Sequence, residues 1–195
     1  MTGRGPRMKA GALASPFAFS LALALTAAAS VQTWFVFGPP ADRAAAAPPP
    51  GYLQAKGNAL FSASFKKLGA NNVDLQALRG KPVIAYFWPS WCVECATEAK
   101  ALQVLQDQHH VSDLVVLGFG VDQADRIERF ARVNAIDFPM FIGGQASVDL
   151  SKKLGNLREG MPFIVAIDRH GQAVASHLGK FGSHTAHDMT AAALR

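Results

Sequence analysis

The sequence contains little cysteine and little charge. Two cysteines among 195 residues exclude a small scaffold that is held together by several disulfides. Charged residues make up 17% of the chain, below the roughly 25% that is usual for soluble proteins, and half of the residues are hydrophobic. This composition excludes an intrinsically disordered chain. It also suggests that part of the apolar content lies outside a globular core.

Motifs of several functional classes are absent as well. No glycine-rich phosphate-binding loop and no Ser/His/Asp set stands out. A peroxidase would be expected to carry a lone cysteine in a Thr-x-x-Cys context, which the sequence does not offer. The net charge is +5, but residues 1–59 carry five basic residues and one acidic residue. The remainder is therefore almost neutral, and we expect no nucleic-acid partner.

The N-terminal part has no charged side chain between Ala10 and Ala41. Residues 17–37 would form a helix of about 31 Å, which is long enough to cross the bilayer core. Three basic residues precede this run, so the positive-inside rule places residues 1–9 in the cytoplasm. We predict a transmembrane signal-anchor over residues 10–38. A signal peptide that is cleaved after the small residues 27–30 is the alternative.

The segment that follows is rich in alanine and proline. Residues 39–59 are predicted to form a semi-rigid spacer. We expect one domain over residues 60–195, because this length suits a single core.

Strand-like and helix-like patterns alternate through this domain. Short apolar runs predict strands, and apolar positions three or four residues apart predict helices. The predicted strands cover residues 83–88, 114–119, 138–142, 162–168 and 172–178, and the predicted helices cover residues 92–108, 123–133, 147–154 and 183–194. Ser183 is the expected N-cap of the last helix. A βαβ unit followed by a hairpin and a closing helix predicts an α/β thioredoxin fold, with a mixed central sheet flanked by helices.

The two cysteines lie where the first long strand leads into a helix. Cys92 would occupy the helix N-terminus, where unpaired N–H groups and the helix dipole favour a thiolate. Cys95 lies one turn further on the same face, close enough to form a disulfide with Cys92. The pattern therefore predicts that Cys92 attacks and that Cys95 resolves the mixed disulfide.

Three other interpretations of the cysteines remain open at this point, and one of them is a pair of buried, inert thiols. A zinc site would need two further ligands, and His184 and His187 are candidates that fit equally well on a solvated helix face. A purely structural disulfide is another alternative, although so short a loop constrains the unfolded chain little. His109 and His110 would interact with the C-terminal dipole of the preceding helix. We expect no metal and no cofactor other than the redox-active disulfide.

Glu98 shares the helix face of Cys95. A carboxyl group that points inward there could pass protons to or from the Cys95 sulfur. A surface salt bridge is the alternative.

Residues 61–195 resemble membrane-anchored, periplasmic thioredoxin-like proteins of the TlpA/ResA/CcmG type. The resemblance rests on residues 75–82, residues 87–88, the Trp-Cys-Val-Glu-Cys segment at 91–95, Glu98, and residues 160–168 with Gly171. It implies a thiol–disulfide oxidoreductase, commonly a reductase and sometimes one that serves cytochrome c maturation. It further implies a single-pass protein of the bacterial inner membrane with its catalytic domain in the periplasm. Its partners would be client protein disulfides and a membrane thiol electron donor.

The resemblance also assigns roles around the cysteine pair. Pro162 would be the family's cis-proline, which turns the backbone of Met161 outward so that a substrate strand can pair with it. An ordinary trans proline that opens a strand is the alternative. Trp91 would contact the substrate, while Val93 and Glu94 would modulate the redox pair.

Three positions depart from the family pattern, and one of them is Lys100, which stands where this family often has proline. Glu94 stands where relatives usually have proline, and Tyr86 stands where typical thioredoxins carry a buried acid. Glu98 is therefore the better acid/base candidate. The favoured function is disulfide reduction. Net disulfide oxidation or isomerisation, and a redox-inert module that binds extended segments at Met161-Pro162, are the alternatives.

Overall fold

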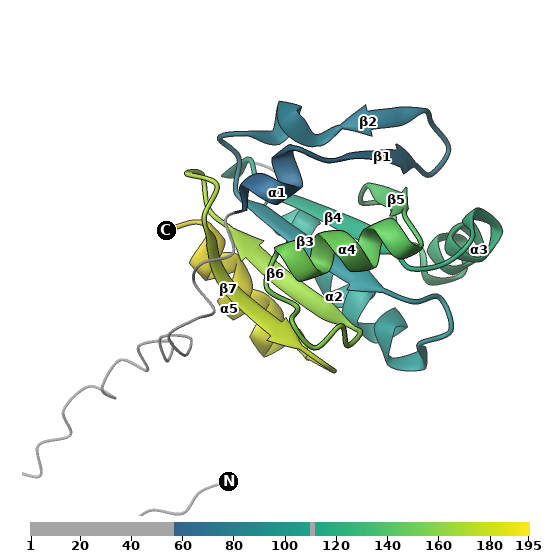
Figure 1. The fold of residues 1–195 in the computed structure, drawn as a ribbon. Helices are drawn as coiled ribbons and strands as arrows, with labels where there is room; N and C mark the ends of the chain where they lie inside the picture. The colour runs from purple at the N-terminus through teal and green to yellow at the C-terminus, as the bar shows by residue number, and fades with distance from the viewer. Residues whose placement is uncertain (1–56, 110–111) are drawn as a thin grey trace, which may run out of the picture. The chain divides into compact units, whose positions relative to one another are not determined.

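The computed structural model describes residues 57–109 and 112–195 (Figure 1). The elements in chain order are α1 (Asn58–Phe61), β1 (Ser64–Lys67), β2 (Asn72–Asp74), the 3-10 helix η2 (Leu75–Leu78), β3 (Val83–Trp88), α2 (Val93–Gln108), β4 (Val115–Gly120), α3 (Ala124–Asn134), β5 (Met140–Ile142), α4 (Gln145–Lys153), β6 (Phe163–Ile167), β7 (Ala173–Leu178) and α5 (Ser183–Ala193).

The strands form one mixed sheet in the order β2-β1-β5-β4-β3-β6-β7. Strands β3, β4 and β5 are parallel neighbours, and the remaining pairs are antiparallel. Every residue of β3 is buried, which explains why its sequence is a continuous apolar run rather than an alternating one. The predicted mixed sheet with flanking helices is confirmed.

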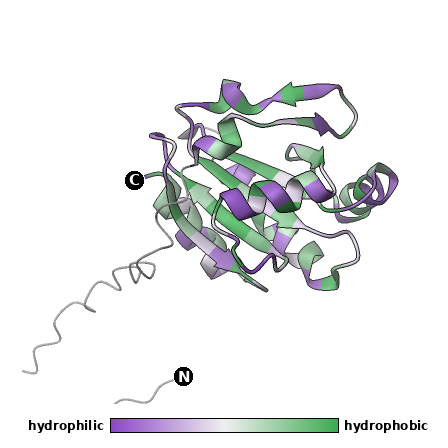
Figure 2. Cartoon of the chain, in the orientation of Figure 1, coloured by the Kyte–Doolittle hydropathy of each residue, from purple (hydrophilic) through white to green (hydrophobic). Residues whose placement is uncertain are grey.

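Two apolar clusters lie on opposite faces of the sheet. Alternate residues of β3 point to each face, since side chains along a strand alternate. Ile84, Tyr86 and Trp88 pack against α2, α3 and α5. Val83, Ala85 and Phe87 pack against α1, η2 and α4. In Figure 1, α4 crosses one face of the sheet and α2 lies behind it. Figure 2 shows the apolar residues gathered in the central strands.

All nine predicted strands and helices are present, with ends shifted by a few residues. The predicted N-cap of the last helix is wrong. Ser183 is the first residue of α5, the cap position is Gly182, and no side chain caps the helix. The hairpin of β1 and β2 was not predicted. Its strands carry one buried side chain, Phe65, so their hydrophobic pattern is weak.

Among residues 57–109 and 112–195, no helix is long and apolar enough to span a membrane. The predicted signal-anchor over residues 10–38 lies outside the described residues, as does most of the predicted spacer over residues 39–59.

Candidate functional site

The cysteine pair lies beyond the ends of two adjacent parallel strands. Trp88, the last residue of β3, pairs with Gly120, the last residue of β4. The N–H of Val121 donates to the carbonyl of Trp88 at 2.8 Å, so the two strands end at the same level and the loops that follow them begin side by side. Loops beyond the carboxyl ends of parallel strands are the usual place for binding sites in such sheets.

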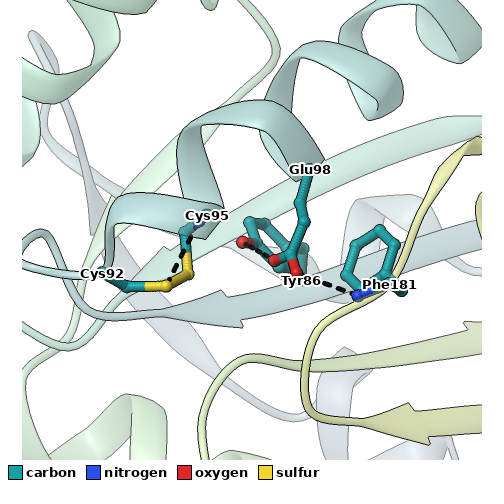
Figure 3. Close-up of a disulfide and its surroundings, with 5 residues drawn as sticks. All are labelled: Tyr86, Cys92, Cys95, Glu98 and Phe181. Carbon is teal, nitrogen blue, oxygen red and sulfur yellow. Dashed lines mark hydrogen bonds between the residues drawn. A yellow bond between two sulfur atoms is a disulfide. The ribbon is translucent and has the colours of Figure 1, made fainter.

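Cys92 and Cys95 are joined by a disulfide at the start of α2 (Figure 3). Cys92 is the N-cap residue, and its Sγ accepts a hydrogen bond from the N–H of Cys95 at 3.2 Å. Cys95 is fully buried, whereas Cys92 is only partly buried. The predicted pairing is therefore present, and Cys92 is the sulfur that a partner can reach. Which cysteine attacks stays a prediction.

Exposed apolar side chains flank Cys92. Trp91 is 74% exposed and Val93 is 82% exposed. In the described part of the chain only three other large apolar side chains, Val104, Val133 and Leu157, are exposed to a similar degree. The partly exposed cysteine is therefore bordered on each side by an exposed apolar side chain.

The Met161–Pro162 peptide bond is cis, as the resemblance implies, and the alternative of a trans proline is wrong. Phe163, the next residue, opens β6 and pairs with Phe87 on β3. Because β6 runs antiparallel to β3, Met161 and Pro162 precede β6 at the same end of these two strands as the loop that leads to Cys92. Pro162 is buried, while Met161 is partly exposed.

Glu98 is buried beneath the first turns of α2, with 1% of its surface exposed. Its Oε2 accepts a hydrogen bond from the hydroxyl of Tyr86 at 2.7 Å, and its Oε1 accepts one from the N–H of Phe181 at 3.0 Å (Figure 3). The alternative of a surface salt bridge is therefore wrong. Cys95 and Glu98 are three residues apart on the same buried face of the helix.

Tyr86 is the residue that the sequence did not identify as a partner of Glu98. Burial raises the pKa of Tyr86 far above its usual value, and the negative charge and the hydrogen bond of Glu98 raise it further. Tyr86 therefore remains a neutral hydrogen-bond donor at physiological pH. Its position on β3, on the same face as Ile84 and Trp88, is the sequence signal that could have indicated this contact.

A second polar group fixes the loop before Cys92. The hydroxyl of Ser90 donates to a carboxylate oxygen of Asp122, which lies in the loop after β4. Asp122 also accepts the N–H of Gln123 at 2.8 Å and pairs with Arg126 at 3.6 Å. Burial raises the pKa of Asp122, but the bonds from Ser90 and Gln123 and the charge of Arg126 outweigh this effect and hold it below its usual value.

The remaining predicted residues lie on the surface or outside the description. Glu94 is exposed in the first turn of α2. His109 follows the end of α2, and His110 lies outside the described residues. His184 pairs with Asp188 across one turn of α5, at 3.0 Å between Nδ1 and the carboxylate, and His187 is exposed. Within the described ranges, no group of three or more His, Cys, Asp or Glu side chains is placed to hold a metal ion.

Comparison with known proteins agrees with the geometry. The profile of the AhpC/TSA family matches residues 57–176, more than half of the chain. The thioredoxin-like protein YneN of Bacillus subtilis is 31% identical over 83 residues, which cover 40% of this chain and 48% of YneN. The thiol-disulfide oxidoreductase ResA of Bacillus anthracis is 24% identical over 116 residues, which cover 58% of this chain and 64% of ResA. The chain thus spans about half to two thirds of the length of these relatives.

A solved structure of a thiol:disulfide interchange protein from Chlorobium tepidum has a similar fold. Its TM-score is 0.61 at 18% identity, over 69% of this chain and 94% of that one. This likeness concerns the fold alone and confirms the thioredoxin-like α/β arrangement. The matches to ResA and YneN confirm the resemblance that the cysteine motif and its neighbours indicate.

Proposed function

The chain belongs to the AhpC/TSA family, and from that premise we propose that it is a thiol–disulfide oxidoreductase that reduces disulfides of client proteins. The observation that carries this proposal is the disulfide at the start of α2, with Cys92 accessible and Cys95 fully buried. ResA, a relative over more than half of the chain, bears the name of a thiol-disulfide oxidoreductase. The cysteine pair is the only redox group that the proposal requires.

The reaction consists of two successive thiol–disulfide exchanges. In the reduced protein, the Cys92 thiolate attacks one sulfur of a client disulfide, forms a mixed disulfide and releases the other client sulfur as a thiolate. The Cys95 sulfur, after losing its proton, then attacks Cys92 Sγ and releases the second client thiolate. The client gains two electrons and leaves as two thiolates, which take up protons from solvent, and the protein is left with the Cys92–Cys95 disulfide.

Glu98 takes the proton that Cys95 must lose in the second exchange. The support is its place one helical turn from Cys95 on the buried face of α2, where water has little access. The hydrogen bonds from Tyr86 and Phe181 hold the carboxylate in place. Glu98 thus acts on the resolving sulfur rather than on the attacking one.

The client segment lies in extended form beside the disulfide. Met161 lies at the same end of the central strands and offers its backbone for pairing. The exposed Trp91 covers the apolar side chains of the client. Val93 and Glu94 are both exposed between the two cysteines, and they modulate the binding of the client and the stability of the Cys92 thiolate.

We place the protein in the bacterial inner membrane, anchored by residues 10–38, with the catalytic domain in the periplasm. The apolar run and the basic residues before it support this location. A membrane thiol donor returns the disulfide to the dithiol after each turnover. Cytochrome c maturation, which requires reduced cysteines in an oxidising compartment, is a process that such a reductase would serve.

Trapping of mixed disulfides tests the proposal. The full-length Cys95→Ser protein should accumulate covalent client complexes that a thiol reductant releases, whereas Cys92→Ser should accumulate few. The wild type should catalyse reduction of insulin by dithiothreitol, and both variants should lose this activity. Equal trapping by both variants would contradict the assignment of the attacking sulfur.

The direction of electron flow needs a separate measurement. Cells that are quenched with acid and then alkylated in denaturant near neutral pH should show Cys92 and Cys95 mostly as a dithiol if the protein is a reductase. A mostly oxidised pair would instead favour the alternative of a disulfide oxidant or isomerase. Absence of both trapping and insulin reduction would favour the redox-inert binding module.

A further inference from the structure

A pocket adjoins the loop that carries the cysteine pair. It has a volume of about 370 Å³ and is lined by Ser90, Arg126, Arg129, Phe130, Val133 and Asn134. Ser90 lies two residues before Cys92, and the other five residues belong to α3. The pocket is therefore bounded by the active-site loop on one side and by a helix on the other.

The lining is positively charged. Arg129 has no ion pair among the residues that the structure describes, and Arg126 is paired with Asp122 at 3.6 Å while its side chain remains 62% exposed. The acidic residues of α3, Asp125 and Glu128, do not line the pocket. An exposed guanidinium without an ion-pair partner is suited to a carboxylate, which it can bind through two parallel hydrogen bonds.

The pocket also has apolar walls. Phe130 is 8% exposed and stacks on Trp88, with 3.9 Å between the ring centroids. Val133, one turn further along α3, is 69% exposed. A side chain with an aliphatic stem and a negative head group, such as glutamate, complements both the apolar walls and the arginines.

The pocket is fixed relative to the redox pair by one carboxylate. Asp122 accepts the hydroxyl of Ser90 and pairs with Arg126, so it joins the cysteine loop to the start of α3. A client side chain that occupies this pocket would be only a few residues away, in the client sequence, from the client cysteine bound to Cys92. A client segment that is joined to Cys92 by a mixed disulfide meets this condition.

We propose that this pocket binds an acidic side chain of the client, a few residues from the client cysteine, and that it makes the protein select disulfides in acidic segments. The inference rests on the proposed function, because it names the class of client for the same cysteine pair. Arg129 is the specificity-determining residue, Arg126 assists it, and Phe130 with Val133 contacts the aliphatic stem.

Reduction of matched peptide disulfides by the full-length protein tests the inference. The peptides are made in sets of three that share one sequence except for glutamate, glutamine or lysine at one position. From set to set, this position lies two, three, four or five residues from the cysteine. At low salt, kcat/KM for the best-placed glutamate peptide should exceed that for its lysine counterpart by about fivefold, the size expected of a partly exposed ion pair. The preference should decrease as the ionic strength rises.

Variants of α3 separate the pocket from the general charge of the protein. Arg129→Gln should abolish the preference and Arg129→Glu should reverse it, each measured as the ratio of kcat/KM for the glutamate peptide to kcat/KM for the lysine peptide. Arg132→Gln is the matched control, because Arg132 is an exposed arginine of the same helix that does not line the pocket. A preference that survives Arg129→Gln, or that Arg132→Gln removes equally, would overturn the inference. If the wild type reduces the three peptides of every set equally, only the inference is wrong. If it reduces none, the proposed function is wrong and the inference with it.

Discussion

At the scale of single residues, the buried carboxylate of Glu98 is the group most constrained by its surroundings. A buried carboxylate is costly unless hydrogen bonds satisfy its oxygens. Tyr86 and Phe181 each donate one such bond, from β3 and from the loop before α5. The contact therefore ties the active-site helix to two other parts of the fold.

Tyr86→Phe tests this contact. Removing the hydroxyl leaves Oε2 of Glu98 without its donor, so the free energy of unfolding at neutral pH should fall by about 1–3 kcal/mol. Urea denaturation of the wild type and the variant measures the difference. Resolution of the mixed disulfide by Cys95 should also become slower in the variant, because Glu98 loses one of the two bonds that orient it.

The pH dependence of stability gives the same contact a second test. The pKa of Tyr86 is raised above its ordinary value of 10.0 in the folded protein, so only the unfolded chain can release this proton just above pH 10. The stabilisation is complete below pH 10 and is lost as the pH rises further. The wild type should therefore lose stability more steeply than Tyr86→Phe above pH 10. Equal slopes for the two proteins would show that Tyr86 ionises freely in the fold.

The sequence identified Glu98 but not its partners, for a physical reason. The spacing of Cys95, Glu98 and Leu102 marks one face of a helix, and burial of that face follows from its other apolar members. The partner N–H belongs to Phe181, which is 83 residues away in the sequence. Only the packing of α5 beside α2 brings it to Glu98, and no local pattern encodes that packing.

At the scale of elements, strength of pattern decided what could be predicted. Strand β3 is a run of six buried residues, and α2 repeats apolar positions over sixteen residues. Both were predicted. Strand β2 is at the edge of the sheet and β1 is its neighbour; they have three and four residues and expose most of their side chains. Short polar edge strands of this kind discourage aggregation but leave little sequence signal.

The pocket beside Ser90 was beyond sequence-based prediction as well. It combines a loop residue with five residues of α3 that follow it by 36 to 44 positions. They meet because β3 and β4 are parallel neighbours whose ends coincide at Trp88 and Gly120. The register of two strands, rather than any motif, creates the pocket.

The first turn of α2 carries a prediction about redox potential. Glu94 is exposed close to Cys92, where its charge opposes a thiolate but favours the helix N-terminus. Glu94→Gln should stabilise the thiolate and therefore the dithiol, and shift the potential toward more oxidising values by about 10–20 mV. Equilibration with glutathione buffers measures the potential, and the pH dependence of Cys92 alkylation reports the thiolate.

Glu128→Gln serves as the control for Glu94, because Glu128 is also an exposed glutamate but lies on α3. It should leave the potential unchanged. If Glu94→Gln leaves both the potential and the alkylation profile at wild-type values, the Glu94 side chain is simply solvated and has no modulating role.

At the scale of the whole molecule, the sheet separates two hydrophobic cores, and the redox pair lies beyond one end of its central strands. The clusters that pack against α2 and against α4 lie on opposite faces of the strands. The loops that hold Trp91 and Met161 lie at the end of the sheet where β3 ends and β6 begins. The layers follow from the order of strands and helices in the sequence, and the meeting of these two loops follows from the antiparallel register of β3 and β6.

The distribution of charge along the whole chain carries the last prediction. Residues 1–59 hold a net charge of +4 and include a run without charge from Ala10 to Ala41, whereas residues 60–195 hold a net charge of +1. An apolar stretch of 21 residues at positions 17–37 is longer than the 7–15 apolar residues of a typical signal peptide. We therefore expect the full-length protein to remain in the membrane fraction after washing with high salt and with carbonate, and to retain its N-terminus. Replacing residues 17–37 with a signal peptide that is known to be cleaved should release an active protein into the periplasm, since the cysteine pair and its supporting contacts all lie after residue 85. A soluble mature form of the native protein that begins near Val31 would show that the segment is cleaved and would refute the anchor.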